Sequence, residues 1–341
     1  MACGTVRAAP SGPLQPIREG FGADGPYEVR VDTVPCRFIL HRTVYVFRPA
    51  VEDTTFPVVF FFPGFGAWHP ANYEPLLRHL ASRGFCVIFP SYLMVQFPMQ
   101  GRTFKLIYAG ALAAAHAHAA HIDTTRIGFA GHSFAASALP GFAYRLITRR
   151  GWGRNGAFMF LMAPFYLFSC PPHVLAHYPP QMKLIVQLYE DDDCNDHRMG
   201  KDLFEAIAIP PENKAYMVLR SDTCPATGYV LKTNHSTPCG PGDPEGVEDG
   251  LDYYGVYRPL DALAQYAFTG DSLAGVIALG DGDSVQTYVG TWGNGEPVRP
   301  SIVSGQAPLL RPSSQFYFHW KHPWNLRRRW CRVKLDDPWE K

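Results

Sequence analysis

Six short apolar segments recur along the middle of this chain, and helical patterns separate several of them. A mostly apolar run of five to seven residues is typical of a β-strand buried on both faces. Between the runs, 73–83 carries leucines at helical spacing and 104–121 is rich in alanine. Strands that alternate with helices predict the α/β class, with a mostly parallel central sheet and helices on both faces. The expected strands of this sheet are 57–62, 85–89, 126–130, 157–162, 183–189 and 215–220.

The chain on either side of this alternation has a different pattern. Segments 26–33 and 41–48 alternate apolar with polar residues, as half-exposed antiparallel strands do. Segment 252–268 is the expected last helix, and from about Gly270 the chain is rich in Gly and Pro with short strand-like pieces. We expect this tail to pack on the main domain, although its tryptophans and arginines would also suit docking to a membrane surface or a partner. These residues are Trp320, Trp324, Trp330, Trp339 and Arg327–Arg329.

The composition excludes several classes of protein. Hydrophobic residues make up 47% of the 341 residues and charged residues 18%, so the chain can bury a large core and is not disordered. A formal net charge of +1 does not indicate a nucleic-acid binder. No apolar stretch reaches the ~18 residues that a transmembrane helix needs, and residues 1–20 contain no apolar core of a secretion signal. We therefore expect no nucleic-acid partner, no transmembrane segment and a cytoplasmic location.

The metal-binding residue types do not form a recognisable metal site. None of the eight cysteines belongs to a C-x-x-C pair, so we expect free, mostly buried thiols. A Cys194–Cys239 bridge in an oxidising compartment is the alternative. His116, His118 and His121 resemble a metal-binding run, but on a helix successive side chains point about 100° apart and cannot converge on one ion. We expect neither a metal nor an organic cofactor.

The segment 131–135 (GHSFA) follows an expected strand and precedes a helical stretch. It differs in one residue, Ala135 for glycine, from G-x-S-x-G, the turn that exposes a nucleophilic serine at a sheet edge. Such a turn projects the serine Oγ and places the next backbone N–H, that of Phe134, where it can stabilise an oxyanion. We therefore expect Ser133 to be a nucleophile. The alternative is a serine that only caps a helix.

The segment 62–66 (FPGFG) ends another expected strand. In this architecture the corresponding loop donates the second oxyanion N–H, which predicts the backbone amide of Phe65 as the donor. The rings of Phe65, Trp68 and Phe134 would form an apolar wall for an acyl or aromatic group. An ordinary Pro-Gly turn is the alternative.

A nucleophilic serine of this kind needs an acid and then a histidine further along the chain. The segment 189–196 (YEDDDCND) follows the expected strand 183–189 and offers four aspartates. We prefer Asp192 and keep Asp191, Asp193 and Asp196 open. Among the histidines that follow, His235 lies in a polar loop that could reach the sheet edge, and the other candidates are His197, His319 and His322.

In the chain's own order, these segments resemble the α/β-hydrolases that include bacterial cutinase-like polyester hydrolases, and more distantly platelet-activating-factor acetylhydrolases and chlorophyllases. The resemblance implies an α/β-hydrolase fold, oxyanion amides at Phe65 and Phe134, an acid at Asp192, a histidine at His235 and a cleft-lining aromatic at Phe165. It covers roughly 25–270 as the catalytic domain, between an N-terminal extension (1–24) and a C-terminal extension (271–341). The segments that carry it are GPYEVR (25–30), FPGFG (62–66), LASRGFCVIFPS (80–91), DTTRIGFAGHSFAA (123–136), MAPF (162–165), YEDDD (189–193) and NHS (234–236).

These observations predict a serine carboxylic-ester hydrolase that acts through an acyl-enzyme on a hydrophobic acyl or aromatic ester. The expected partner is a small-molecule or lipid ester substrate. A lipid-acyl hydrolase or acyltransferase would use the same residues. A non-catalytic binding protein with a hydrolase fold is the alternative from another class.

Overall fold

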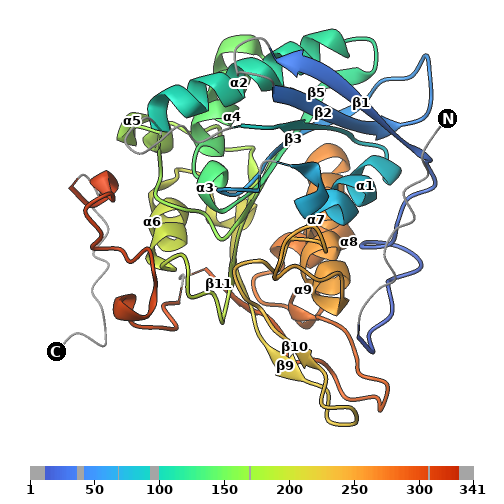
Figure 1. Ribbon diagram of the computed structural model, residues 1–341, viewed down its shortest axis with the longest axis vertical. Helices are drawn as coiled ribbons and strands as arrows, with labels where there is room; N and C mark the ends of the chain where they lie inside the picture. Colours follow the sequence, from blue (N-terminus) through green and yellow to red (C-terminus); the bar gives the residue numbers. More distant parts are fainter. Residues whose placement is uncertain are drawn as a thin grey trace.

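The core of the molecule is a nine-stranded sheet with the strand order β1-β2-β4-β3-β5-β6-β7-β8-β11 (Figure 1). The computed structural model of the chain describes residues 12–36, 42–67, 69–92, 100–168, 170–305 and 308–329. Six neighbouring strands run parallel to one another, namely β4, β3, β5, β6, β7 and β8. Strands β1, β2 and β11 join the sheet in antiparallel pairs. The strands are β1 (Val29–Cys36), β2 (Arg42–Pro49), β3 (Phe56–Phe62), β4 (Cys86–Pro90), β5 (Ile122–His132), β6 (Ala157–Met162), β7 (Lys183–Tyr189), β8 (Lys214–Leu219) and β11 (Ile302–Ser304).

Helices cover both faces of this sheet, which confirms the predicted α/β class. Strand β3 shows why: Phe60 and Phe62 pack into one hydrophobic core and Val59 and Phe61 into the other, because successive side chains of a strand point to opposite faces. The first face carries α2 (Gln100–Ala117), α4 (Leu139–Arg150), α5 (Pro172–Ala176) and α6 (Arg198–Ala206). The second carries α1 (Glu74–Ser82), the π-helix η3 (Leu251–Tyr257), α7 (Arg258–Thr269) and α8 (Ser272–Leu279), as Figure 1 shows.

Helix α2 ends four residues earlier than the alanine-rich pattern predicts. The turn after Ala117 brings His118 within 3.4 Å of Asp32 on β1 and His121 within 3.6 Å of Glu52, just after β2. Within the described ranges, His, Cys, Asp and Glu form no group of three or more that could hold a metal ion.

The chain beyond Gly270 contributes more regular structure than its composition suggests. It forms two helices, α8 and α9 (Ser284–Thr287), and the strand β11. Asp271 caps α8 by accepting the Ala274 amide at 2.7 Å, and Ala274, Ile277 and Ala278 are buried in the second core. An aspartate followed by an apolar run is a helix signal, but the Gly and Pro content of the tail obscured it.

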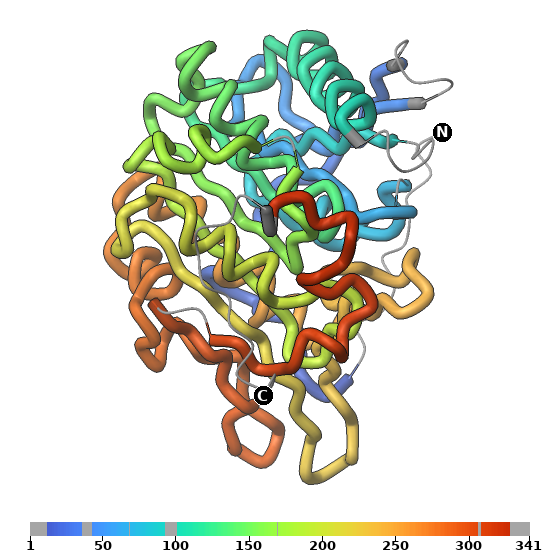
Figure 2. The backbone as a smooth tube through the Cα atoms, turned by 90° about the vertical axis from the view of Figure 1, so that its left-hand side faces the viewer, coloured from blue at the N-terminus to red at the C-terminus, as the bar shows by residue number. Residues whose placement is uncertain are grey.

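The C-terminal segment 308–329 crosses the molecule beside the first face of the sheet (Figure 2, red). Its main ionic anchor is Arg327, whose guanidinium lies 2.7 and 3.2 Å from the two carboxylate oxygens of the buried Asp202 on α6. Trp320 is half-buried against the first core, whereas Trp324 is exposed. Trp330 and Trp339 lie outside the described residues.

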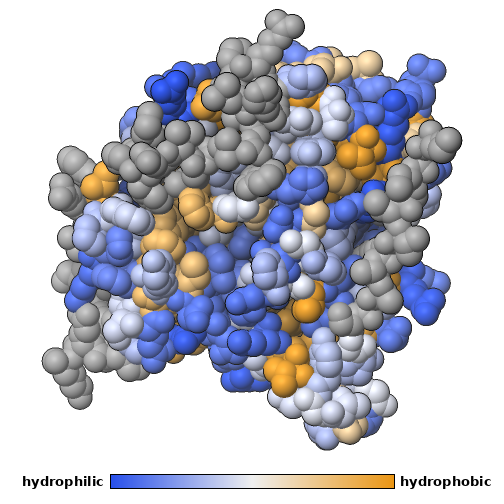
Figure 3. Space-filling view, in the orientation of Figure 1, coloured by the Kyte–Doolittle hydropathy of each residue, from blue (hydrophilic) through white to orange (hydrophobic). Residues whose placement is uncertain are grey.

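The face of the molecule in Figure 3 is mainly hydrophilic, and its hydrophobic residues form small separate groups. Among the helices described above, none combines the length and the apolar character that crossing a bilayer requires.

Candidate active site

Ser133 lies on a strained turn between β5 and the short helix α3 (Ser133–Ala136). Its φ of 51° belongs to the left-handed region, which residues other than glycine seldom adopt. Close packing makes the turn possible: a Cβ on Gly131 would lie 2.6 Å from Leu139 and 2.9 Å from the Phe62 carbonyl oxygen. Ala135 is fully buried without such a conflict, so the glycine of the usual pattern is needed at 131 and not at 135.

The structure brings His235 into contact with both Ser133 and Asp192. His235 Nε2 lies 2.9 Å from Ser133 Oγ, and Nδ1 lies 2.8 Å from an Asp192 carboxylate oxygen. His235 belongs to the loop after β10 (Val230–Leu231), and Asp192 to the turn after β7. The three side chains come from segments 43 to 102 residues apart and form one hydrogen-bonded chain.

The Asp192 carboxylate is held in place by its own turn. One oxygen accepts the amides of Cys194 at 2.7 Å and Asn195 at 3.1 Å, which leaves the other oxygen for His235. Burial raises the pKa of Asp192, but His235, His197 and the Asn195 amide together lower it by more, so the acid is ionised at neutral pH. Burial also lowers the pKa of His235, while the Asp192 carboxylate and, after it, Cys194 together raise it by more, which stabilises an imidazolium.

The other acids have different neighbours. Asp191 accepts the Ser221 hydroxyl at 2.6 Å, and Asp193 is exposed. Asp196 is buried, forms an ion pair with Arg198 at 3.0 Å and accepts the Trp320 amide at 2.7 Å.

The other candidate histidines also lie apart from Ser133. Buried His197 bonds the Tyr189 carbonyl oxygen through Nε2 at 3.0 Å. His319 and His322 belong to the C-terminal segment, where their rings are 5.5 Å apart. The thiols of Cys194 and Cys239 are both free, so the alternative of a disulfide between them is wrong.

The two expected oxyanion donors lie on either side of the turn. Phe134 follows Ser133 as the second residue of α3, and its buried ring is 6.2 Å from the ring of Phe65, which is 60% exposed. Gly64, next to Phe65, approaches the turn closely, since a Cβ there would lie 3.4 Å from Ser133 Cβ. The 62–66 loop and the nucleophile turn are therefore adjacent.

A tyrosine that the sequence patterns did not single out fixes this loop. The buried Tyr73 hydroxyl accepts the Gly64 amide at 2.9 Å and forms a second hydrogen bond with His132 Nδ1, 2.8 Å away. His132 packs against His235 with ring centroids 4.7 Å apart. Burial and the neighbouring His235 lower the pKa of His132, so it stays neutral beside the histidine that contacts Ser133.

Asn195 is a second residue near the serine that sequence reasoning missed. Its side chain is buried and its Nδ2 donates to the Ala163 carbonyl oxygen at 2.9 Å and lies 3.4 Å from Ser133 Oγ. Only the amide nitrogen can donate to that carbonyl, which fixes the orientation of the side chain. No sequence signal marked it, because it lies among the acids of the same turn.

The two expected substrate-lining residues have different outcomes. Trp68 lies outside the described residues. Phe165 donates its backbone amide to the Ser133 carbonyl oxygen at 3.1 Å, and its ring is 4% exposed among Phe134, Phe168 and Phe318.

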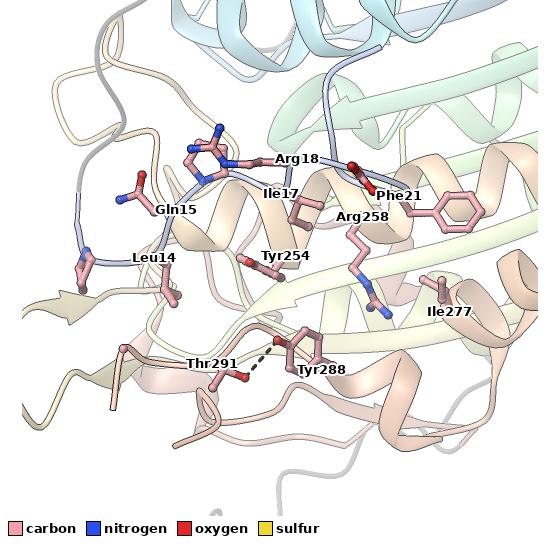
Figure 4. Close-up of a pocket in the computed structure, with 14 residues that line it drawn as sticks. Leu14, Gln15, Ile17, Arg18, Phe21, Tyr254, Arg258, Ile277, Tyr288 and Thr291 are labelled. Carbon is pink, nitrogen blue, oxygen red and sulfur yellow. Dashed lines mark hydrogen bonds between the residues drawn. The ribbon is translucent and has the colours of Figure 1, made fainter. Parts of the chain in front are cut away.

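A cavity of about 590 Å³ lies elsewhere, between the N-terminal segment and α7 (Figure 4). Its walls include Ile17, Tyr254, Arg258 and Tyr288, and Tyr288 bonds Thr291 at 3.1 Å. No member of the Ser133, His235 and Asp192 chain lines it, so we place the candidate active site at the serine turn.

Comparison with known proteins agrees with the fold. A family model described as Chlorophyllase matches residues 21–144, about a third of the chain, and includes Ser133 but neither Asp192 nor His235. No curated protein matches the chain. The narrower resemblance to cutinase-like polyester hydrolases stays a prediction. Chlorophyllases are one family of the α/β-hydrolases, and the chain belongs to that superfamily.

Proposed function

We propose that the protein is a serine carboxylic-ester hydrolase that works through an acyl-enzyme. The observation that carries this proposal is the position of His235, whose two ring nitrogens lie within 2.9 Å of Ser133 Oγ and an Asp192 oxygen. This is the arrangement in which an imidazole takes the proton of a serine hydroxyl while a carboxylate stabilises the resulting charge.

In the first half-reaction, His235 Nε2 accepts the Ser133 proton as Oγ attacks the ester carbonyl carbon. The amides of Phe65 and Phe134 donate to the oxyanion of the tetrahedral intermediate. His235 then gives its proton to the leaving alcohol, which departs as the acyl-enzyme forms. In the second half-reaction, His235 takes a proton from water as the water oxygen attacks the acyl carbon. The bond between this carbon and Ser133 Oγ then breaks, His235 returns the proton to Oγ, and the acid is released.

Aromatic rings around the serine favour a substrate with a hydrophobic acyl or aromatic group. Phe134 and Phe165 are buried, the half-buried Phe168 packs against both, and Phe65 extends this cluster to the surface. The exposed Phe65 ring also suits a lipid ester, so a lipid-acyl hydrolase or acyltransferase is the second candidate. The hydrogen bonds that join Ser133, His235 and Asp192 favour a catalytic protein over one that only binds its ligand.

The decisive experiment compares wild type with Ser133→Ala. We expect wild type to react with a fluorophosphonate at Ser133 and to hydrolyse p-nitrophenyl acetate or longer esters, and Ser133→Ala to do neither. A wild-type protein that neither labels nor turns over any acyl ester contradicts the proposal. Phospholipids and long-chain esters with and without an acceptor alcohol, assayed in parallel, separate the two candidate activities.

A further inference from the structure

The C-terminal segment pairs with the turn that carries Asp192. Phe318 donates its amide to the Cys194 carbonyl oxygen at 2.8 Å and accepts the Asp196 amide at 3.1 Å, so it forms a parallel bridge with Asn195. Arg311 of the same segment donates to the Asp192 carbonyl oxygen at 2.9 Å. The tail is therefore bonded directly to the backbone of the candidate active site.

This bridge determines where the Phe318 ring lies. Side chains of paired residues in neighbouring strands extend to the same side of the ladder. The side chain of Asn195 extends to Ser133, with Nδ2 3.4 Å from Oγ. The Phe318 ring therefore lies on the side of the ladder that faces the serine.

A second set of contacts places Phe318 in the same position. Its ring meets that of Phe165 edge-on, with centroids 4.9 Å apart, and Phe165 is bonded through its amide to the Ser133 carbonyl. Phe165 is nearly fully covered, whereas Phe318 is half-buried. Phe318 is thus a partly exposed ring at the edge of the aromatic cluster that contains Phe165.

We propose that Phe318 is a specificity-determining residue that limits the size of the acyl group that an ester can place beside Ser133. The inference rests on the proposed function and adds that the C-terminal segment supplies one wall of the substrate site. The bonds on both sides of Asn195 fix the backbone of Phe318, and the edge-on contact with Phe165 restrains its ring. The wild-type site accordingly favours small acyl groups, and a smaller residue at 318 admits larger ones.

The test measures kcat/KM for p-nitrophenyl acetate and decanoate in wild type, Phe318→Ala, Phe318→Leu and Phe318→Trp. We expect the decanoate-to-acetate ratio to rise about tenfold or more in Phe318→Ala, to rise less in Phe318→Leu and to fall in Phe318→Trp. Tyr317→Ala is the matched control, because Tyr317 shares the bridge segment but its side chain is 77% exposed. Its ratio should equal that of wild type.

Two further measurements separate the possible failures. Labelling of Ser133 by a methyl and a dodecyl fluorophosphonate gives the same size ratio without turnover. Arg327→Gln removes the ion pair that anchors the tail to Asp202 without changing the Phe318 side chain. An unchanged decanoate-to-acetate ratio in Phe318→Ala overturns the assignment to the Phe318 ring. A shift of this ratio in Arg327→Gln equal to that in Phe318→Ala overturns it as well. In both cases the activity of wild type still supports the esterase. A wild type without labelling or turnover refutes the esterase itself.

Discussion

The Tyr73 hydroxyl lies 2.8 Å from Nδ1 of His132, the residue that precedes Ser133 in the nucleophile turn. The same hydroxyl accepts the Gly64 amide, so one side chain joins the strained turn to the loop that carries Phe65. The relative position of the proposed nucleophile and of one proposed oxyanion donor therefore depends on a buried phenol from the first helical segment after that loop.

Tyr73→Phe should lower kcat by about tenfold to a hundredfold, because it leaves the Gly64 amide unpaired and frees the oxyanion loop to shift. The unpaired buried groups should also lower the free energy of unfolding by about 1–3 kcal/mol. Tyr108→Phe is the matched control, since its buried hydroxyl donates to the Ala138 carbonyl oxygen at 2.6 Å, away from that loop. The control should lose stability but keep its kcat, and equal losses of kcat in both variants would contradict the positioning role.

Asp192→Asn should reduce kcat about 10⁴-fold, because a neutral amide neither holds the reactive tautomer of His235 nor stabilises its positive charge. Asp191→Asn changes the preceding carboxylate, which bonds Ser221 and not His235, and should retain nearly full activity. Steady-state hydrolysis of p-nitrophenyl acetate measures both. Comparable losses of activity in the two variants would show that the assignment of Asp192 as the acid is wrong.

The activity should fall in acid with a midpoint above the ordinary histidine pKa of about 6.5. Only neutral His235 can accept the serine proton, and the Asp192 carboxylate raises the pKa of His235, so the ring becomes inactive at a higher pH than a free imidazole would. The pH profile of kcat/KM reports this group in the free enzyme. A midpoint below 6.5 would show that another group controls the reaction. In Asp192→Asn the residual activity should persist to lower pH.

Asn195→Ala should lower kcat by about tenfold, because Ser133 Oγ loses the amide that lies 3.4 Å away and opposes its rotation. Asn195→Asp should be at least as damaging, since a carboxylate there faces the Ala163 carbonyl oxygen. The KM for p-nitrophenyl acetate should change little in Asn195→Ala. A rise in KM with unchanged kcat would instead indicate a role in substrate binding.

His79 links the N-terminal segment to α7 and should make stability depend on pH. Its ring is fully buried, with Nδ1 3.0 Å from Asp24 and Nε2 3.1 Å from Asp261. Burial lowers the pKa of His79, but the two carboxylates raise it by more. Stability from this group is therefore fully present below about pH 6.5, the unfolded value, and is lost as the pH rises through the higher folded value.

Denaturant unfolding at several pH values between 5.5 and 8.5 measures this contribution. His79→Gln should be less stable than wild type by about 1–3 kcal/mol at pH 5.5, and the difference should shrink as the pH rises. His116→Gln, at an exposed histidine near the end of α2, is the control and should follow wild type at every pH. A constant difference across this range would show that His79 does not bind an additional proton on folding.

Local sequence patterns predicted the strands of the sheet well, because burial on both faces leaves a continuous apolar run that is visible without neighbours. The run 57–62 is β3, and the run 157–162 is β6 without a change of boundary. The early end of α2 and the additional helix α8 were not predicted, because each depends on a turn or cap that composition does not reveal.

The candidate site divides in the same way. The strand–turn–helix pattern around Ser133 pointed to this serine by itself, because the whole pattern lies within one short segment of the chain. The sequence offered four aspartates and four histidines for the remaining places, and only the folded chain brought Asp192 and His235 to hydrogen-bonding distance of each other and of the serine. Tyr73, Asn195 and Phe318 had no local signal at all. Their contacts join segments that are distant in the chain, and such contacts depend on how strands and loops are arranged in three dimensions.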